Sequence, residues 1–378
     1  MKFFETTHQD GRARAGLLRI PTPDGVVEVE TPVFMPVGTR ASVKALWQED
    51  LEQIGYRLIL GNTYHLYLRP GDELVEEMGG LRRFMTWPGA ILTDSGGYQA
   101  FSLGANVKFY ENGVQFASHI DGSRHLFTPD KVVDIQRRLG SNIMMVLDDC
   151  APADANAARL RTGLERTHRW ARESVEYHAR LADAGRIDPG MHRMFGIVQG
   201  GTDPELRKES AAAIQSMPFS GIAVGGLSVG ESRADMYATL ETLAPDLDPD
   251  RPRYLMGVGT IPDFLEAVRH GFDMFDCVLP TRNARNGQLL TSRGRINIRN
   301  ARYARESEPP DPACECRVCR RYSLAYLRHL FSVGEMLGPQ MATFHNLYFY
   351  HTFMAQLRAA IREERFSEFY EGWKKISI

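Results

Sequence analysis

The amino-acid sequence predicts an α/β protein whose core is a closed barrel of eight parallel strands surrounded by helices, the (β/α)8 or TIM-barrel class. Eight short apolar runs recur along the chain, and each ends in glycine, a polar residue or proline. Runs that are apolar on both faces are typical of buried parallel strands. No glycine-rich dinucleotide fingerprint follows the first run, which disfavours an open doubly wound sheet. The predicted strands are Val33–Val37, Arg57–Leu60, Ala90–Thr93, Ile143–Leu147, Met194–Val198, Gly221–Val224, Tyr254–Met256 and Met274–Leu279.

Helical patterns fill most of the gaps between these runs. Thr128 is the expected N-cap of a helix that ends at Gly140, and Thr260 begins another that has Pro262 in its first turn. These are the usual start and stop signals of helices. Alternation of strands and helices favours a barrel. The sequence also predicts helices over residues 159–184, 203–217 and 351–364.

Two segments do not fit a plain strand–helix repeat. Residues 95–128 are too long for a helical crossover, and the alternating run Val114–Ile120 predicts a hairpin insertion there. Residues 287–350 follow the eighth run and predict a small subdomain. We therefore expect a catalytic barrel made of residues 1–286 and 351–378, interrupted by a zinc-binding subdomain at 287–350.

Composition limits the class of protein. The chain has 378 residues, of which 43% are hydrophobic and 24% charged, which is ordinary for a globular protein. No stretch approaches the roughly 20 apolar residues of a membrane span. The first ten residues lack the apolar core of a signal peptide, so we expect a cytoplasmic protein. Five cysteines in that compartment indicate metal binding or catalysis rather than disulfides.

Three of these cysteines form a C-x-C-x2-C motif. Cys314, Cys316 and Cys319, with His345 further along, make a Cys3His set that suits one Zn2+ per chain. Four protein ligands leave no open position for water, so we expect a structural metal that stabilises the subdomain. His329 and His351 lie nearby in the sequence and are alternatives to His345.

Charge is unevenly distributed. Residues 282–321 contain ten arginines and no lysine against four acidic residues, a balance of +6, so the rest of the chain carries −8 of the total of −2. An arginine-rich segment in an acidic protein is a candidate phosphate-contacting face. A solvated surface without a partner is the alternative.

The residues that follow the strands form a chemically coherent set. In a barrel the carboxyl ends of the strands meet at one face, where function is concentrated. Asp94 and Asp276 fit substitution at an anomeric carbon, one attacking and the other moving a proton. A planar base would fit between Tyr98 and Met256, which we call the base slot. Its polar edge would be read by three further groups: Asp148, Gln199 and the backbone N–H of Gly226.

Each aspartate also has a plainer interpretation. Asp276 lies in an apolar run that Pro280 ends, and such a residue often caps the next element or pairs with an arginine. The set as a whole also fits a retaining glycosidase acting on sugars through Asp94 and Asp276. A non-catalytic, zinc-stapled RNA-binding protein is the third alternative.

Several segments resemble one family, the tRNA-guanine transglycosylases, also called queuine tRNA-ribosyltransferases. They follow the family order along nearly the whole chain. The resemblance implies a modified TIM barrel with a zinc subdomain that acts on the wobble guanine, anticodon position 34, of certain tRNAs. The matching segments are Thr31–Thr39, Leu60–Leu66, Leu92–Gln99, Val224–Leu227, Tyr254–Gly259, Asp276–Arg282 and the cysteine motif.

The resemblance also implies roles for single residues. Asp276 resembles the nucleophile that attacks ribose C1′ and forms a covalent ribosyl-enzyme, and Asp94 resembles the general acid/base. Arg282 and Arg285 resemble the anticodon-loop readers. The remaining matches are base-binding residues: Asp148, Gln199, Gly226 and Leu227 at the polar edge, and Tyr98 and Met256 at the two faces.

Two positions indicate the branch of the family. Cys150 and Val229 resemble the bacterial branch, whose incoming base is 7-aminomethyl-7-deazaguanine, whereas the eukaryotic branch takes queuine. Resemblance to the bacterial branch also implies a homodimer. Val198 departs from the family, which often has a second glutamine before Gln199, and we expect little effect.

Overall fold

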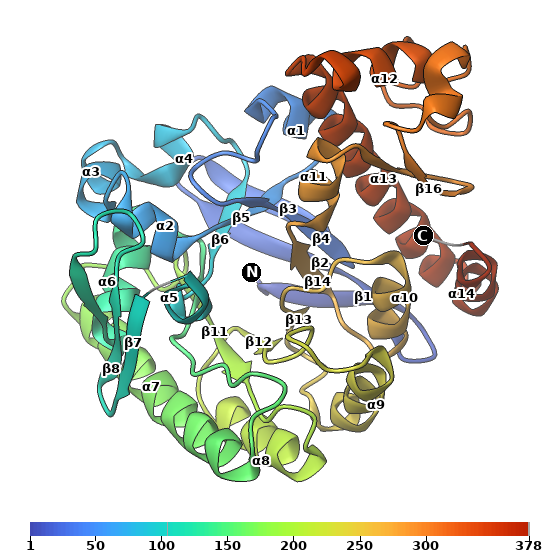
Figure 1. Cartoon of the computed structure of the whole chain (residues 1–378). Helices are drawn as coiled ribbons and strands as arrows, with labels where there is room; N and C mark the ends of the chain where they lie inside the picture. Colours follow the sequence, from blue (N-terminus) through green and yellow to red (C-terminus); the bar gives the residue numbers. More distant parts are fainter. Residues whose placement is uncertain (104, 377–378) are drawn as a thin grey trace.

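The computed structural model of the protein describes residues 1–103 and 105–376. Its centre is a closed barrel of eight parallel strands that follow one another around the ring in chain order (Figure 1), which confirms the predicted fold class. Each predicted run overlaps one strand. The barrel strands are β4 (Val33–Gly38), β5 (Leu58–Gly61), β6 (Ala90–Thr93), β10 (Ile143–Met145), β11 (Arg193–Val198), β12 (Gly221–Val224), β13 (Arg253–Leu255) and β14 (Met274–Cys277).

The eighth strand ends earlier than the sequence predicts. The run was expected to continue to Leu279, but β14 ends at Cys277 and α11 (Leu279–Arg285) begins two residues later. Pro280 occupies the first turn of that helix, where the missing N–H costs nothing. The proline therefore lies in the first turn of a helix and does not itself end the strand, and both site arginines lie on α11.

Most predicted helices are confirmed within a few residues. Helix α6 begins after Thr128, whose side chain accepts from the N–H of Lys131, and ends at Gly140 in the left-handed conformation. Helices surround the strands on the outside of the barrel (Figure 1). The helices from β4 to β14 are α1 (Gln48–Ile54), α2 (Thr63–Leu68), α3 (Asp72–Glu77), α4 (Gly80–Phe84), α5 (Gly97–Leu103), α6 (Pro129–Leu139), α7 (Ala157–Asp183), α8 (Pro204–Gln215), α9 (Arg233–Leu243), η1 (Ala244–Asp246) and α10 (Ile261–Arg269).

The predicted hairpin insertion is a three-stranded antiparallel sheet. Strands β7 (Ala105–Tyr110), β8 (Gly113–Ala117) and β9 (Arg124–Phe127) pair in the order β7-β8-β9. The sheet lies outside the barrel beside α5, α6 and α7 (Figure 1). Its central strand contains the first four residues of the alternating run, which was expected to continue to Ile120.

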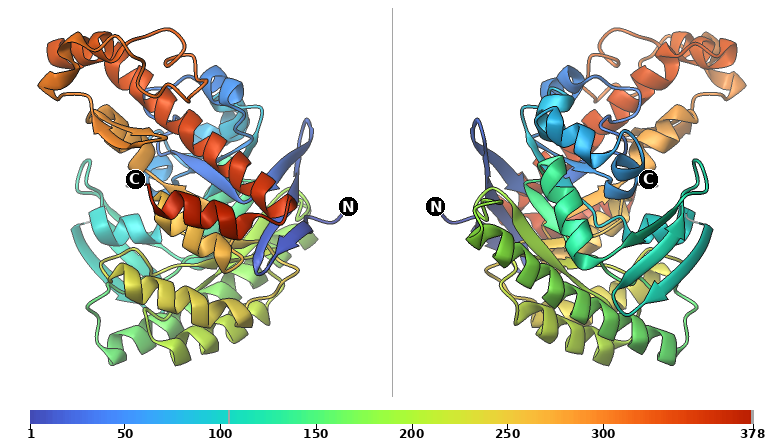
Figure 2. Two further views of the ribbon diagram at one scale, coloured as in Figure 1. Left: turned by 90° about the vertical axis from the view of Figure 1, so that its right-hand side faces the viewer. Right: turned by 90° about the vertical axis from the view of Figure 1, so that its left-hand side faces the viewer.

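The subdomain after β14 ends in a helix longer than predicted. Helix α13 (Leu337–Arg362) begins well before residue 351 and runs from the subdomain along the side of the barrel (Figure 2). Gly338 and Pro339 resemble a loop in sequence, but proline is tolerated in a first helical turn. The other elements are β15 (Gln288–Thr291), β16 (Gly294–Asn297), η2 (Ala301–Arg305), α12 (Leu324–Val333) and α14 (Phe366–Lys374).

A three-stranded sheet that is absent from the predicted elements covers the amino ends of the barrel strands. Strands β1 (Phe4–Asp10), β2 (Ala13–Thr22) and β3 (Gly25–Thr31) form it. Arg14 on β2 makes an ion pair of 2.5 Å with the fully buried Asp273, just before β14.

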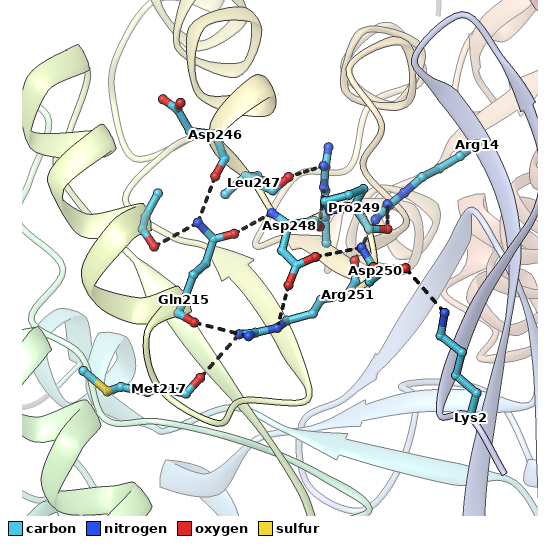
Figure 3. A network of polar contacts seen from close by, with 12 residues as sticks. Lys2, Arg14, Gln215, Met217, Asp246, Leu247, Asp248, Pro249, Asp250 and Arg251 are labelled. Carbon is cyan, nitrogen blue, oxygen red and sulfur yellow. Dashed lines mark hydrogen bonds and ion pairs between the residues drawn. The ribbon is translucent and has the colours of Figure 1, made fainter.

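A polar network fixes the loop before β13 at the same end (Figure 3). Gln215 donates to the carbonyl of Asp246 and accepts from the N–H of Asp248, and Asp248 pairs with Arg251 at 3.0 Å. Arg14 also donates to the carbonyls of Pro249 and Arg251. None of the described helices is long and apolar enough to span a membrane.

Candidate functional site

The predicted site residues lie at one end of the barrel. Asp94 directly follows β6, Gln199 follows β11, and Met256 follows β13. Asp148 and Gly226 lie two or three residues beyond β10 and β12, and Asp276 is near the end of β14. Because all eight strands are parallel, these positions share the carboxyl face.

Asp94 is held by neutral donors. Its carboxylate accepts from the Asn62 side chain at 2.5 Å and from the N–H of Thr63 at 2.8 Å. Asn62 is at the same time the N-cap of α2, where its oxygen accepts from the N–H of His65. Burial and, to a smaller extent, the charge of Asp276 raise the pKa of Asp94 to about 7, although the hydrogen bonds from Thr63 and Asn62 oppose the rise. Near neutral pH this carboxyl group therefore both holds and releases a proton.

Asp276 is also held without a cation. It accepts from the Tyr254 hydroxyl at 2.5 Å and from the N–H of Gly257 at 2.8 Å. Burial raises the pKa of Asp276, and these two donors oppose the rise because they stabilise the ionised form. Burial and the charges of Asp276 and Asp94 raise the pKa of Tyr254 well above its usual value, so its hydroxyl stays a donor.

The two aspartates are close enough for their charges to interact. The charge of Asp276 raises the pKa of Asp94, and both charges act on Tyr254. Among the described residues, no arginine, lysine or histidine lies within ion-pair distance of either carboxylate. The plainer interpretation of Asp276 as the partner of an arginine is therefore wrong.

Asp148 and Gln199 form a second polar pair. The Gln199 amide donates to Asp148 at 2.7 Å, and the Ser95 hydroxyl donates to Asp148 at 3.3 Å. Burial raises the pKa of Asp148 to about 6, and the neighbouring Asp149 contributes to the rise. This edge offers carboxylate acceptors beside an amide, the groups needed to recognise a guanine-type edge.

Gly226 lies against this pair. A Cβ atom there would collide with the Gln199 side-chain oxygen, and the residue has a left-handed φ of 66°. Both conditions require glycine. The N–H of Gly226 interacts with the thiol of Cys150, whose pKa burial raises to about 12. Leu227, the next residue, is buried.

The two predicted faces of the base slot belong to different elements. Tyr98 is in the first turn of α5 with 46% of its surface exposed, so its ring is accessible. Met256 directly follows β13 and is partly buried. Their stacking on a base stays a prediction.

The two site arginines lie on α11, directly after β14. Arg282 is exposed, and Arg285 is partly buried. The buried Nη1 of Arg285 has no hydrogen-bond partner among the described residues. Burial, and then the charge of Arg282, lowers the pKa of Arg285. A buried guanidinium nitrogen without a partner is a donor that an acceptor on a ligand would satisfy.

The predicted metal ligands converge in the subdomain. Donor atoms of Cys314, Cys316, Cys319 and His345 lie within 4.8 Å of one another. The three sulfur atoms are 3.8, 3.5 and 3.3 Å from Nδ1 of His345. Tetrahedral zinc with ordinary bond lengths separates sulfur and nitrogen ligands by about 3.6 Å. The four residues therefore fit a zinc ion.

A further contact selects His345 over the other histidines. Its Nε2 donates to the carbonyl of Leu290 at 2.7 Å, which leaves Nδ1 directed at the thiols. His345 is fully buried within α13. His351 packs instead on Tyr56 and against Gly55.

Sequence reasoning missed the residues that hold the two aspartates. Asn62 and Thr63 follow β5, and the polar end of that run was a usable signal. Tyr254 had no such signal, because a tyrosine inside an apolar run looks like core. Gly257 acts through its backbone N–H, and the direction of an N–H group cannot be predicted from a glycine in the sequence.

Comparison with known proteins agrees with the geometry. A family model described as Queuine tRNA-ribosyltransferase matches residues 9–377. Proteins with that name include one from Solidesulfovibrio magneticus, 56% identical over 95% of this chain and 94% of its own length. Those from Leptospira biflexa and Herpetosiphon aurantiacus are 53% and 52% identical, over 93% and 97% of this chain and 92% and 90% of their own lengths.

Proposed function

Since the chain belongs to the queuine tRNA-ribosyltransferase family, and is thus a pentosyltransferase acting on tRNA, we propose that it exchanges the wobble guanine of tRNA for 7-aminomethyl-7-deazaguanine. The observation that carries this proposal is that Asp94 and Asp276 lie at the same end of the barrel, interact electrostatically and accept hydrogen bonds from neutral donors. Because the donors are neutral, the negative charge of each aspartate is not cancelled before the substrate binds.

In the first displacement, a carboxylate oxygen of Asp276 attacks ribose C1′. The C1′–N9 bond breaks, its electron pair leaves with guanine, and Asp94 donates the proton that neutralises the departing base. The product is an ester between Asp276 and ribose. The pKa of Asp94 near 7 supports this role, because a general acid is most effective near the working pH.

The second displacement reverses these roles. Asp94 accepts the N9 proton of the incoming base, and N9 attacks C1′ and releases the Asp276 carboxylate. One N-glycosidic bond is exchanged for another, so no nucleotide energy source is needed. Two inversions give net retention at C1′.

Recognition of the base is assigned to the second polar pair. Asp148 would accept from the N1–H and amino group of a guanine-type base, and Gln199 and the N–H of Gly226 would contact its carbonyl edge. Leu227 would pack beside them, and Tyr98 and Met256 would cover the two faces. Cys150 and Val229 support the smaller base over queuine.

A base-exchange assay tests the proposal. Purified protein is incubated with tRNA carrying guanine at position 34 and with labelled guanine, then with competing 7-aminomethyl-7-deazaguanine or queuine. We expect label in tRNA and competition by the first base but not by queuine. Sugar release from oligosaccharides without label in tRNA would favour the glycosidase alternative, and tRNA binding without exchange would favour the RNA-binding alternative.

Arg282 and Arg285 are proposed to contact the anticodon loop. The unpartnered Nη1 of Arg285 supports this, as does their position on α11 beside Asp276. Replacing either with glutamine should raise KM for tRNA by about tenfold, since one lost charge-assisted contact is worth roughly 1.5 kcal/mol. KM for free guanine should stay within twofold; an equal rise in both constants would contradict the role.

Cys314, Cys316, Cys319 and His345 would hold zinc with all four positions filled, so its contribution is to folding. The division into a barrel (1–286 and 351–378) and a zinc subdomain (287–350) is proposed with it. Replacing His345 with alanine should lower the metal-to-protein ratio and Tm together. An unchanged ratio would place the fourth ligand elsewhere.

A homodimer and a cytoplasmic location are proposed as well. Several large apolar side chains are exposed on α12 and the start of α13, among them Tyr326, Val333 and Met336, which supports burial against a second copy. Reduced thiols as metal ligands fit a reducing compartment. Sedimentation equilibrium should give twice the mass of the 42.6 kDa chain, and Val333→Glu should shift it to one chain.

A further inference from the structure

A buried arginine lies beneath the proposed base-reading residues. Arg207 in the first turns of α8 has only 1% of its surface exposed. Among the described residues, no carboxylate lies within ion-pair distance of it, and burial lowers the pKa of Arg207 to about 10. Burying a charge without a counter-ion is costly, so its hydrogen bonds must compensate.

Its partners are backbone carbonyls of two adjacent loops. At the end of β11 and in the loop that follows, Arg207 donates from Nη1 to Val198 at 2.9 Å and from Nε to Gly201 at 2.7 Å. After β12, it donates from Nη1 to Gly225 at 2.8 Å and from Nη2 to Gly226 at 3.3 Å. One planar guanidinium thus ties the loop that carries Gln199 to the loop that carries Gly226.

These bonds fix the direction of the N–H groups on the opposite side. The carbonyl of Gly225 and the N–H of Gly226 belong to one trans peptide, so they point in opposite directions. With the carbonyl directed at Arg207, the N–H is directed away from it, toward the Cys150 thiol. The same relation holds for the carbonyl of Gly226 and the N–H of Leu227.

The Gln199 side chain depends on the same arrangement. Its amide reaches Asp148 while lying so close to Gly225 and Gly226 that a Cβ at either position would meet it. Its backbone N–H is fixed separately by the Ser210 hydroxyl at 3.0 Å. A shift of the loop after β12 would therefore displace the amide from Asp148.

We propose that Arg207 is a positioning residue for the exchanged base, which fixes the two loops that present Gln199 and the N–H of Gly226. It acts through these residues and does not touch the base. The inference rests on the proposed function and extends it to base affinity: loss of Arg207 should weaken binding of the free base and leave tRNA binding in place.

The test compares Arg207→Met and Arg207→Lys with a matched control, Arg253→Met. Arg253 is another buried arginine that donates to backbone carbonyls, those of Leu247 and Asp248, but at the amino end of the barrel. KM for guanine, KM for tRNA, kcat and Tm are measured for all four proteins. Lysine keeps the charge but has one donor nitrogen in place of three.

We expect Arg207→Met to raise KM for guanine at least about tenfold, and Arg207→Lys to fall between it and wild type, while KM for tRNA stays within twofold. Arg253→Met should lower Tm comparably without moving KM for guanine. Equal KM for guanine in the Arg207 and Arg253 variants, or failure of both Arg207 variants to fold, would overturn the inference by reducing Arg207 to a stabilising residue. Absence of exchange by wild type would instead refute the proposed function.

Discussion

Strand β14 has an aspartate near each end, and the two are held in opposite ways. Asp273, at the amino end, is fully buried and receives two hydrogen bonds from the guanidinium of Arg14 and one from the N–H of Arg253. Asp276, at the carboxyl end, accepts from the hydroxyl of Tyr254 and the backbone N–H of Gly257, and among the described residues no arginine pairs with it. A charge neutralised by arginine holds structure together, whereas a charge held by neutral dipoles remains available to react.

The contrast holds for further carboxylates at each end, but not for Asp149, which pairs with two arginines at the carboxyl end. At the amino end, Asp248 pairs with Arg251 within the network of Figure 3. At the carboxyl end, Asp94 and Asp148 accept from amides and hydroxyls, and burial raises the pKa of both. Shifted carboxyl groups clustered at one face are typical of a catalytic site.

The largest expected effect is at Asp276. Asp276→Asn should reduce base exchange by roughly 10⁴-fold or more, because it removes the proposed nucleophile. Its Tm should be unchanged or higher, since no cation loses a partner. Exchange kinetics and thermal unfolding check this; Asp273→Asn is the matched control, which should lose stability and keep its activity per folded molecule. Activity of Asp276→Asn above a tenth of the wild-type value would contradict the role of Asp276 as nucleophile.

Asp94→Asn should have the next largest effect. The amide cannot donate an acidic proton to the leaving guanine or accept one from the incoming base, so exchange should fall by about 10²–10⁴-fold. Binding of tRNA should be retained, as measured by filter binding. A variant that exchanges guanine at the wild-type rate would exclude Asp94 from proton transfer.

Arg14→Met sharpens the structural half of the comparison. Removing one partner of a buried pair leaves Asp273 unneutralised and should cost about 3–5 kcal/mol in the free energy of unfolding. KM for guanine and for tRNA should not change. Denaturant unfolding measures the free energy of unfolding, and exchange kinetics measure the two KM values. A higher KM for guanine with unchanged stability would contradict the claim that the amino end stabilises the fold and the carboxyl end binds the base.

A smaller effect concerns the pH dependence of stability. An aspartate ordinarily titrates near pH 4, and Asp94 in the folded protein titrates at about 7, so between these values the folded state binds the extra proton. Stability should therefore fall as pH rises through this interval. Asp94→Asn should flatten that part of the curve, measured by urea unfolding at several pH values. An unchanged slope would mean that Asp94 titrates normally.

The barrel could be predicted from the sequence because each strand leaves a local signal. Apolar runs such as Gly221–Val224 coincide with their strands, and Thr128 and Gly140 bound α6 as expected. The sheet β1–β3 escaped because it belongs to no strand–helix repeat. The start of α13 at Leu337 escaped because Gly338 and Pro339 look like a loop.

The candidate site also has a part that could be predicted from the sequence and a part that could not. Asp94, Asp148 and Asp276 were predictable as polar ends of apolar runs. The residues that hold them could not be predicted, because these contacts form only in the tertiary structure. Asn62 donates to Asp94, Tyr254 donates to Asp276, and Arg207 donates to the loop that carries Gly226. Arg207 in particular looks like one more charged residue on a polar helix, and only the fold reveals it as buried.

Trapping the covalent intermediate tests the central claim most directly. Wild-type protein is incubated with tRNA in the absence of free base, quenched in denaturant, digested with protease and nuclease, and analysed by mass spectrometry. We predict a ribose-linked RNA fragment on the peptide that contains Asp276, and none when Asp276→Asn is used. A fragment attached to Asp94, or no adduct from a preparation that exchanges guanine, would contradict the account.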